Sequence, residues 1–288
     1  MKYRRNLFKF FFSFLFSIFF IKKAKSDLIV TDFEKRTGFR NYGLPSKFEK
    51  IFRWIIANSN LQGNGVSYTP LSRLVGTIVP NGLHFERHHY GVPLKKPDDF
   101  FLKIEGLDGE KFEYSINRLR SEKLLSIKTF IECGGNSNVL YNAKPVKTSV
   151  DYIHGLFSIS EWTGIPLGRF LVNLTEKYKN KKNIWIEFSS FDKGTYNISL
   201  PIKVLELNSL LALYQNGEPI RPEQGYPLRL IIPGWEGSTH VKWLNKIKFR
   251  YGPAYTRNET SRYTDLLPNG KSRQYSFLMD LKSIITSQ

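Results

Sequence analysis

The sequence predicts a mixed α+β fold, and three observations support this. Short apolar or alternating runs, broken by Gly, Pro and Asn, recur from Leu71 onward and are typical of strands. Helix-like spacing of apolar residues lies between them, at 166–178 and 203–214. After residue 26 there is neither an internal repeat nor a low-complexity segment. We therefore expect mostly one domain. The strand-like runs are 101–104, 125–131, 184–188 and 228–232.

Residues 1–26 have the layout of a signal peptide. A basic start precedes an apolar run from Phe10 to Ile21, which is shorter than the roughly 20 residues that span a bilayer. The sequence Arg4-Arg5-Asn6-Leu7-Phe8-Lys9 resembles a twin-arginine signal, an address for proteins exported already folded. We therefore expect a periplasmic protein. An uncleaved leader is the alternative, and the only expected attachment to a membrane.

The remaining chain is expected to consist of two parts. Apolar residues between Phe33 and Ile55 recur at helix-like spacing, so 27–66 is predicted to be an N-terminal helical extension. The polar, Gly-containing stretch 58–65 indicates a linker or exposed loop within it. The main domain is then 67–288.

Charge and cysteine content narrow the function classes. The 288 residues carry a formal charge of +18, part of it in the leader, and the rest favours an acidic partner or an anionic ligand. No C2H2, helix-turn-helix or RNP pattern supports nucleic-acid binding. Cys133 is the only cysteine, which excludes an internal disulfide, a covalent c-type haem and a four-thiolate cluster.

The stretch 77–93 contains the first polar cluster. His84, His88 and His89 lie within six residues and suggest a metal, but their spacing fits no zinc pattern. Arg87 lies among them. Because a guanidinium group is planar and permanently charged, this cluster suits an oxyanion or a phosphate instead.

The second cluster surrounds the cysteine. A predicted strand runs into Cys133, and Gly134 and Gly135 then allow a close approach of the backbone. A thiolate is a soft ligand for a transition metal, and successive N–H groups of a Gly-rich turn can hold an anion. The simpler interpretation is a buried cysteine that only packs.

Two further clusters, 154–167 and 224–244, are weaker by themselves. Ser160 and Glu161 in the first are consistent with capping of a following helix. The second places a strand at 224–229 before a Gly-rich turn, as in a hairpin.

Taken together, the order and spacing of these motifs resemble the molybdenum domain of sulfite-oxidase-type enzymes, and most of all the molybdenum subunit of Sox-type sulfane/sulfite dehydrogenases. The resemblance covers Tyr68 to Thr286. It implies an α+β molybdopterin-binding domain of mixed sheets with helices. The chain departs from the pattern at Gln288, where relatives continue into a C-terminal immunoglobulin-like dimerisation domain, which we expect to be lacking here. The matching motifs are Asn81 to Pro93, Cys133-x-Gly-Asn-Ser, Ser160-Glu161-Trp-Thr-Gly, Pro222 to Arg229 and Glu259 to Asp265.

The resemblance also implies roles for individual residues. Cys133 corresponds to the thiolate ligand of molybdenum. Arg87, His89 and His154 are expected in a basic funnel leading to the metal, although His154 is equally consistent with a core histidine bonded to backbone. Gln224 replaces a His or Asn of relatives. The expected contacts of the molybdenum–molybdopterin cofactor are Phe85, Glu86, Arg87, His88, His89, Cys133, Asp192, Gln224, Arg229, His240, Val241 and Lys242.

The implied activity is oxidation of sulfite or sulfane sulfur by oxygen-atom transfer. Electrons would pass to a c-type cytochrome, because no haem is expected on this chain. The alternatives are a molybdopterin-dependent sulfoxide reductase and a truncated, cofactor-free interaction module. Two departures weaken the sulfite-specific interpretation: Asn138 stands where sulfite oxidases have a second arginine, and Leu213 stands where they have a tyrosine.

Overall fold

The computed structural model describes residues 48–57, 64–274 and 277–286. The chain divides into two compact units, Met1–Lys50 and Ile51–Gln288, and all described helices and strands belong to the second. The expected signal peptide lies outside the described residues, as do residues 27–47 of the expected extension.

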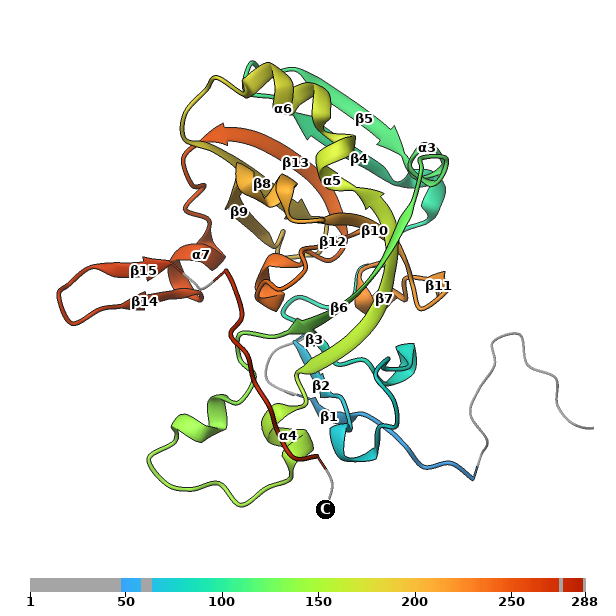
Figure 1. Cartoon of the computed structure of the whole chain (residues 1–288), viewed down its shortest axis with the longest axis vertical. Coiled ribbons are helices and arrows are strands. Elements are labelled where there is room, and N and C mark those ends of the chain that lie inside the picture. Colours follow the sequence, from blue (N-terminus) through green and yellow to red (C-terminus); the bar gives the residue numbers. More distant parts are fainter. Residues whose placement is uncertain (1–47, 58–63, 275–276, 287–288) are drawn as a thin grey trace, which may run out of the picture. The chain divides into compact units, whose positions relative to one another are not determined.

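Much of the hydrophobic core packs on a five-stranded sheet of order β5–β4–β13–β8–β9 (Figure 1). β4 and β13 are parallel, and the other neighbours are antiparallel. Ile186 and Phe188 of β8 are fully buried, as expected for alternate residues that face a core. The strands are β4 (Phe101–Glu105), β5 (Lys111–Ser115), β8 (Ile184–Ser190), β9 (Asn197–Pro201) and β13 (Leu244–Tyr251).

A second sheet of order β11–β10–β7–β6, with β12 also paired to β10, carries the cysteine turn at one end of β6. The long strand β7 crosses the molecule (Figure 1). A Cβ at Gly164 of β7 would overlap the backbone of Leu211, so this pairing of β7 with β10 requires glycine. The strands are β6 (Leu125–Glu132), β7 (Phe157–Pro166), β10 (Leu210–Gln215), β11 (Glu218–Pro219) and β12 (Arg229–Ile231).

Smaller elements complete the described unit. The three-stranded sheet comprises β1 (Trp54–Ala57), β2 (Gly65–Tyr68) and β3 (Glu86–His88), and β14 (Thr264–Leu266) pairs with β15 (Ser272–Gln274). The helices are α3 (Ile116–Arg120), α4 (Val150–His154), α5 (Leu167–Phe170), α6 (Val172–Tyr178) and α7 (Arg257–Ser261). None of the helices within the described ranges is long and apolar enough to cross a membrane.

Short 3-10 helices connect several of these elements. They are η1 (Leu71–Arg73), η2 (Asn81–Leu83), η3 (Pro97–Asp99), η4 (Asn138–Tyr141), η5 (Ile202–Glu206), η6 (Pro222–Gln224) and η7 (Gly237–Thr239). Two of them contain or adjoin predicted site residues: η6 ends at Gln224, and η7 directly precedes His240.

The predicted α+β class is confirmed, together with the strand runs and the helical stretch at 166–178, which forms α5 and α6. Other expectations were wrong. The predicted helical extension contains strand β1, which pairs with β2, and the boundary after residue 66 falls inside β2. Ser160 and Glu161 lie within β7 and cap no helix.

The predicted helix at 203–214 was also wrong over its second half. It is a 3-10 helix only to Glu206, and from Leu210 the chain forms β10. β10 pairs with β7 along one edge and with β12 along the other, so Leu210 to Ala212 are fully buried. A continuous apolar run of this length is compatible with either element, and here pairing with neighbouring strands decides the outcome.

Helix α7 is anchored to β9 through a buried carboxylate. Glu259, which is 2% exposed, accepts hydrogen bonds from the Ser199 amide at 2.7 Å, the Ser199 hydroxyl at 2.6 Å and the Thr256 amide at 2.6 Å. The amide and hydroxyl of Ser199 thus share one carboxylate oxygen, and the Thr256 amide takes the other. This anchor fixes the position of the residues that follow α7.

We expect Glu259→Gln to lower the free energy of unfolding by about 2 kcal/mol, because the amide nitrogen cannot accept a bond that the carboxylate accepts. Urea denaturation would measure the change. Glu206→Gln, at an exposed position, is the matched control and should stay within about 0.5 kcal/mol of the parent protein. Equal effects of the two substitutions would contradict the anchoring role of Glu259.

Candidate functional site

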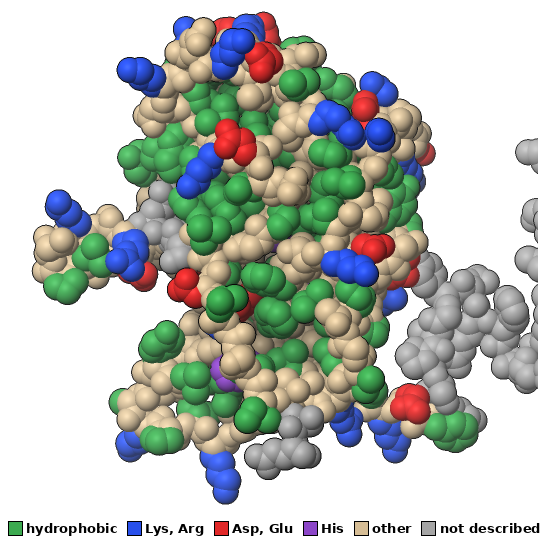
Figure 2. All heavy atoms as spheres, in the orientation of Figure 1, with side chains coloured by type: hydrophobic (Ala, Val, Ile, Leu, Met, Phe, Trp, Pro, Cys, Tyr) green, Lys and Arg blue, Asp and Glu red, His purple; other side chains and the backbone are tan. Residues whose placement is uncertain are grey.

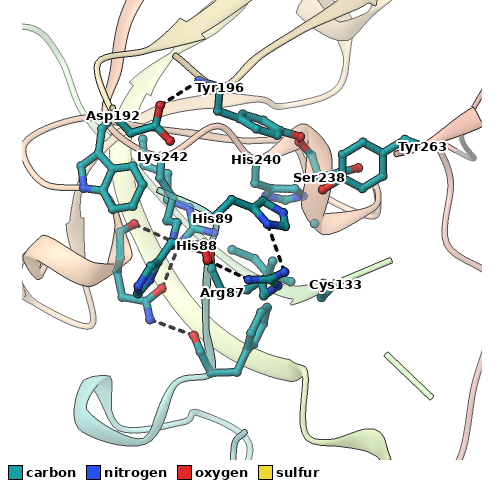
Figure 3. Close-up of a pocket in the computed structure, with 16 residues that line it drawn as sticks. Arg87, His88, His89, Cys133, Asp192, Tyr196, Ser238, His240, Lys242 and Tyr263 are labelled. Carbon is teal, nitrogen blue, oxygen red and sulfur yellow. Dashed lines mark hydrogen bonds between the residues drawn. The ribbon is translucent and has the colours of Figure 1, made fainter. Parts of the chain in front are cut away.

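Segments far apart in the sequence meet at one cavity (Figure 3). β3 and its flanks supply the arginine–histidine cluster, and the turn after β6 supplies the cysteine. The loop after β8, the segment from η6 to β12, the segment from η7 to β13 and the end of α7 close the wall. Ten predicted site residues line the cavity: Phe85, Arg87, His88, His89, Cys133, Asp192, Gln224, Arg229, His240 and Lys242.

Three predicted residues lie elsewhere. Glu86 does not line the cavity and pairs with Arg53 at 2.9 Å, and Val241 is buried in the hydrophobic core. His154 does not share a funnel with Arg87 and His89. It lines a different cavity, beneath the C-terminal segment, and its Nδ1 lies 2.7 Å from the Ser137 hydroxyl. The alternative expectation was a bond from His154 to a backbone group. The observed partner is instead the Ser137 side chain.

The other two histidines of the 77–93 cluster, His84 and His88, have different surroundings. His84 is fully buried, between Phe85 and Trp162, and burial lowers its pKa to about 3. His88 lies 3.1 Å from Glu86. β3 ends at His88, and both His88 and His89 line the cavity, whereas His84 does not.

Arg229 places a positive charge inside the protein without a carboxylate beside it. Its side chain is 4% exposed and donates to the Gln224 backbone oxygen and side-chain oxygen, both at 3.0 Å. The guanidinium group lies 5.1 Å from the Trp162 ring centre, and its Nε has no hydrogen-bond partner among the described residues. Burial lowers the pKa of Arg229 to about 9.

Lys242 adds a second charge of the same sign. Its ammonium group donates to the backbone oxygens of Arg87 at 2.8 Å and Glu223 at 3.0 Å. Burial, and then the nearby Arg229 charge, lower the pKa of Lys242 to about 7. Neither cation forms an ion pair with a carboxylate in the described part of the chain. Because buried charges are stable only when they are paired, this wall of the cavity suits an anion.

The thiol of Cys133 lies at the same cavity. Its backbone is fixed on both sides, since its amide donates to Leu156 at 3.0 Å and its carbonyl accepts from Asn136 at 2.9 Å. Burial raises the pKa of the Cys133 thiol. The glycine turn is tightly packed, as expected, although the group approaching Gly134 is the Glu236 carboxylate. A soft sulfur ligand beside an anion-binding wall is the donor set that a metal–pterin phosphate cofactor needs.

Arg87 and His89 lie together at the cavity, in a region that we call its mouth. Arg87 Nη2 lies 3.0 Å from His89 Nδ1, and Figure 3 shows this pair next to Cys133. Burial and the Arg87 charge lower the pKa of His89 to about 3, so its ring is neutral. On the outer face shown in Figure 2, by contrast, Lys and Arg side chains are scattered rather than gathered in one patch.

Several lining residues were not predicted. Gly237, Ser238 and Trp243 belong to the Gly-rich motif that contains His240 and Lys242, so their proximity in sequence was an available signal. Tyr263 belongs to the Glu259–Asp265 motif, for which the resemblance implies no individual roles. Tyr196 had no local signal: from the loop after β8, its hydroxyl donates to the Ser238 backbone oxygen of η7 at 2.7 Å. Ile131 is the remaining unpredicted residue.

Comparisons with known proteins show similarity in sequence and in fold. Residues 89–256 match the family model of the oxidoreductase molybdopterin binding domain. The chain is 28% identical over 200 residues to mitochondrial sulfite oxidase of Homo sapiens, covering 67% of this chain and 36% of that protein. It is 31% identical over 195 residues to the NADH nitrate reductase of Petunia hybrida, covering 63% and 21%.

A solved structure is similar over most of the fold. The sulfane dehydrogenase SoxCD from Paracoccus pantotrophus matches with a TM-score of 0.77 and 33% identity. The match covers 85% of this chain and 63% of that chain. The chain therefore spans only part of the length of each of these relatives.

The burial of Lys242 predicts a pH-dependent stability. Its pKa near 7 in the folded protein lies below the value of about 10.4 in an unfolded chain. Between these values the unfolded state binds the extra proton, so the free energy of unfolding of the cofactor-free protein should rise with pH. In urea denaturation, Lys242→Met should remove up to about 1.4 kcal/mol per pH unit of this slope. Lys193→Met, at an exposed position, is the control, and equal slopes in both variants would contradict the prediction.

Proposed function

Because the chain belongs to the oxidoreductase molybdopterin binding family, we propose that it holds a molybdenum–molybdopterin cofactor in the described cavity and oxidises sulfite or sulfane sulfur. The observation that carries the proposal is the combination of Cys133 with Arg229 and Lys242, two cations that lack a carboxylate partner within the described ranges. The cofactor phosphate would offset these charges, and the thiolate would bind the metal.

The protein's own groups have separate tasks in this proposal. When bound, the cofactor supplies two-electron oxygen-atom-transfer chemistry. Gln224 and Lys242 fix the shape of the cavity wall, because they donate to the backbone oxygens of Phe85 and Arg87. Arg87 then presents a planar guanidinium group to an anionic substrate, with its orientation set by bonds to Asn64 and to the His88 backbone oxygen.

The electron acceptor and the location are proposals of the same kind. A c-type cytochrome with an acidic surface is a suitable acceptor for a chain with a formal charge of +18, because opposite charges steer association. The similarity to a sulfane dehydrogenase supports a sulfur substrate. The twin-arginine-like leader supports periplasmic export of the folded, cofactor-loaded protein.

Cofactor content tests the first part of the proposal. Purified from a molybdopterin-competent host, the protein should contain about one molybdenum per chain, by elemental mass spectrometry, together with pterin. Cys133→Ser should retain pterin and change the visible absorption, because the thiolate ligand is lost. A folded protein with neither metal nor pterin would contradict the enzyme function and favour an interaction module.

Substrate recognition tests the second part. Arg87→Gln should raise the KM for sulfite at least about tenfold in a steady-state assay with oxidised cytochrome c, because a charge-assisted bond to the anion is lost. Arg87→Lys, which keeps the charge, should recover part of this loss. Thermal denaturation must show that both variants are folded. Turnover of methionine sulfoxide with a reduced dye, without sulfite oxidation, would favour the reductase alternative.

A further inference from the structure

Arg262, directly after α7, approaches the arginine–histidine pair at the cavity mouth. Its Nη1 lies 2.7 Å from Nδ1 and 3.3 Å from Nε2 of His89. Arg87 Nη2 lies 3.0 Å from the same Nδ1. The neighbouring residue, Tyr263, lines the cavity. Two guanidinium groups from distant parts of the sequence therefore converge on one imidazole ring.

The two arginines compete for one acceptor. A neutral imidazole has a single nitrogen with a free lone pair, so His89 accepts one strong hydrogen bond at a time. Arg87 is also held through Nη1 by the Asn64 side chain and by the His88 backbone oxygen at 2.7 Å. Arg262 is exposed, and in the described part of the chain its side chain contacts only His89 through hydrogen bonds. Arg262 is therefore the donor that can leave the ring.

The mouth also lacks a negative charge to balance the two arginines. Within the described ranges, neither Arg87 nor Arg262 forms an ion pair with a carboxylate. Like charges this close repel each other, and an oxyanion that accepts from both guanidinium groups would remove the repulsion. The planar fork of arginine suits two oxygen atoms of one anion.

We propose that Arg262 is a specificity-determining residue, which leaves His89 when substrate enters and joins Arg87 in holding an oxyanion with two negative charges. The inference rests on the proposed function for its substrate class.

The test compares Arg262→Gln and Arg262→Lys with the matched control Arg257→Gln, which removes the same charge from an exposed position on α7. Binding of sulfate, a non-oxidisable dianion, is measured by calorimetry on the purified protein at constant ionic strength. The KM and kcat for sulfite are then measured with an uncharged quinone and with cytochrome c as acceptors. Molybdenum content is determined for every variant.

In Arg262→Gln we expect the sulfate Kd and the sulfite KM to rise at least about tenfold, with kcat within about threefold of the parent protein. Arg262→Lys should be intermediate, and Arg257→Gln should bind sulfate as the parent does. A KM for sulfite that rises only with cytochrome c would overturn the inference and place Arg262 at the acceptor interface. Loss of molybdenum in Arg262→Gln would also overturn it.

Failure of this inference is distinguishable from failure of the proposed function. An unchanged sulfate Kd in Arg262→Gln, with molybdenum retained and sulfite oxidised, overturns only the role of Arg262. A parent protein without cofactor or turnover overturns the proposed function. In that case sulfate binding, which requires no turnover, still decides whether Arg262 holds a dianion.

Discussion

Arg229 and Lys242 place two positive charges at one wall of the cavity. The contacts around them offset part of the free-energy cost of burying these charges. Each cation is met by neutral oxygens, mainly from the backbone, rather than by a carboxylate. Such contacts solvate a charge only in part, as the lowered pKa values of both residues indicate. An anion that binds next to both cations would therefore stabilise the folded protein.

The same contacts hold the site together. Lys242 connects the segment before β13 to the backbone of Arg87 and of Glu223, and Gln224 connects η6 to Phe85. Removing a cation would therefore also loosen the segments that position Arg87. Charge and geometry at this wall are consequently coupled, and an anion that stabilises the cations also stabilises the orientation of the arginine at the mouth.

The sequence allowed the α+β class and most of the cavity wall to be predicted, for different reasons. The cysteine turn follows a clear alternating strand, and Arg229 and Lys242 lie in motifs whose order identifies the family. The strand at Trp54 and the second half of the 203–214 run were not predictable, because their partners, β2, β7 and β12, are remote in sequence. Tyr196 reaches the site by tertiary contacts alone, which leave no local pattern, whereas Arg262 lies in the Glu259–Asp265 motif but its contact with His89 depends on the tertiary fold.

The charges at the cavity fall into two groups with different contacts, and this bears on substrate choice. Arg229 and Lys242 lie at the wall assigned to the cofactor, whereas Arg87 and His89 line the cavity where Arg262 contacts His89. Relatives that share the cofactor-binding domain are named for different substrates, sulfite and nitrate. A cofactor shared by such relatives would not distinguish these anions, so in our proposal the discrimination rests on Arg87 and Arg262. Two guanidinium groups that share one neutral acceptor favour a dianion over a monoanion, since only a dianion balances both charges.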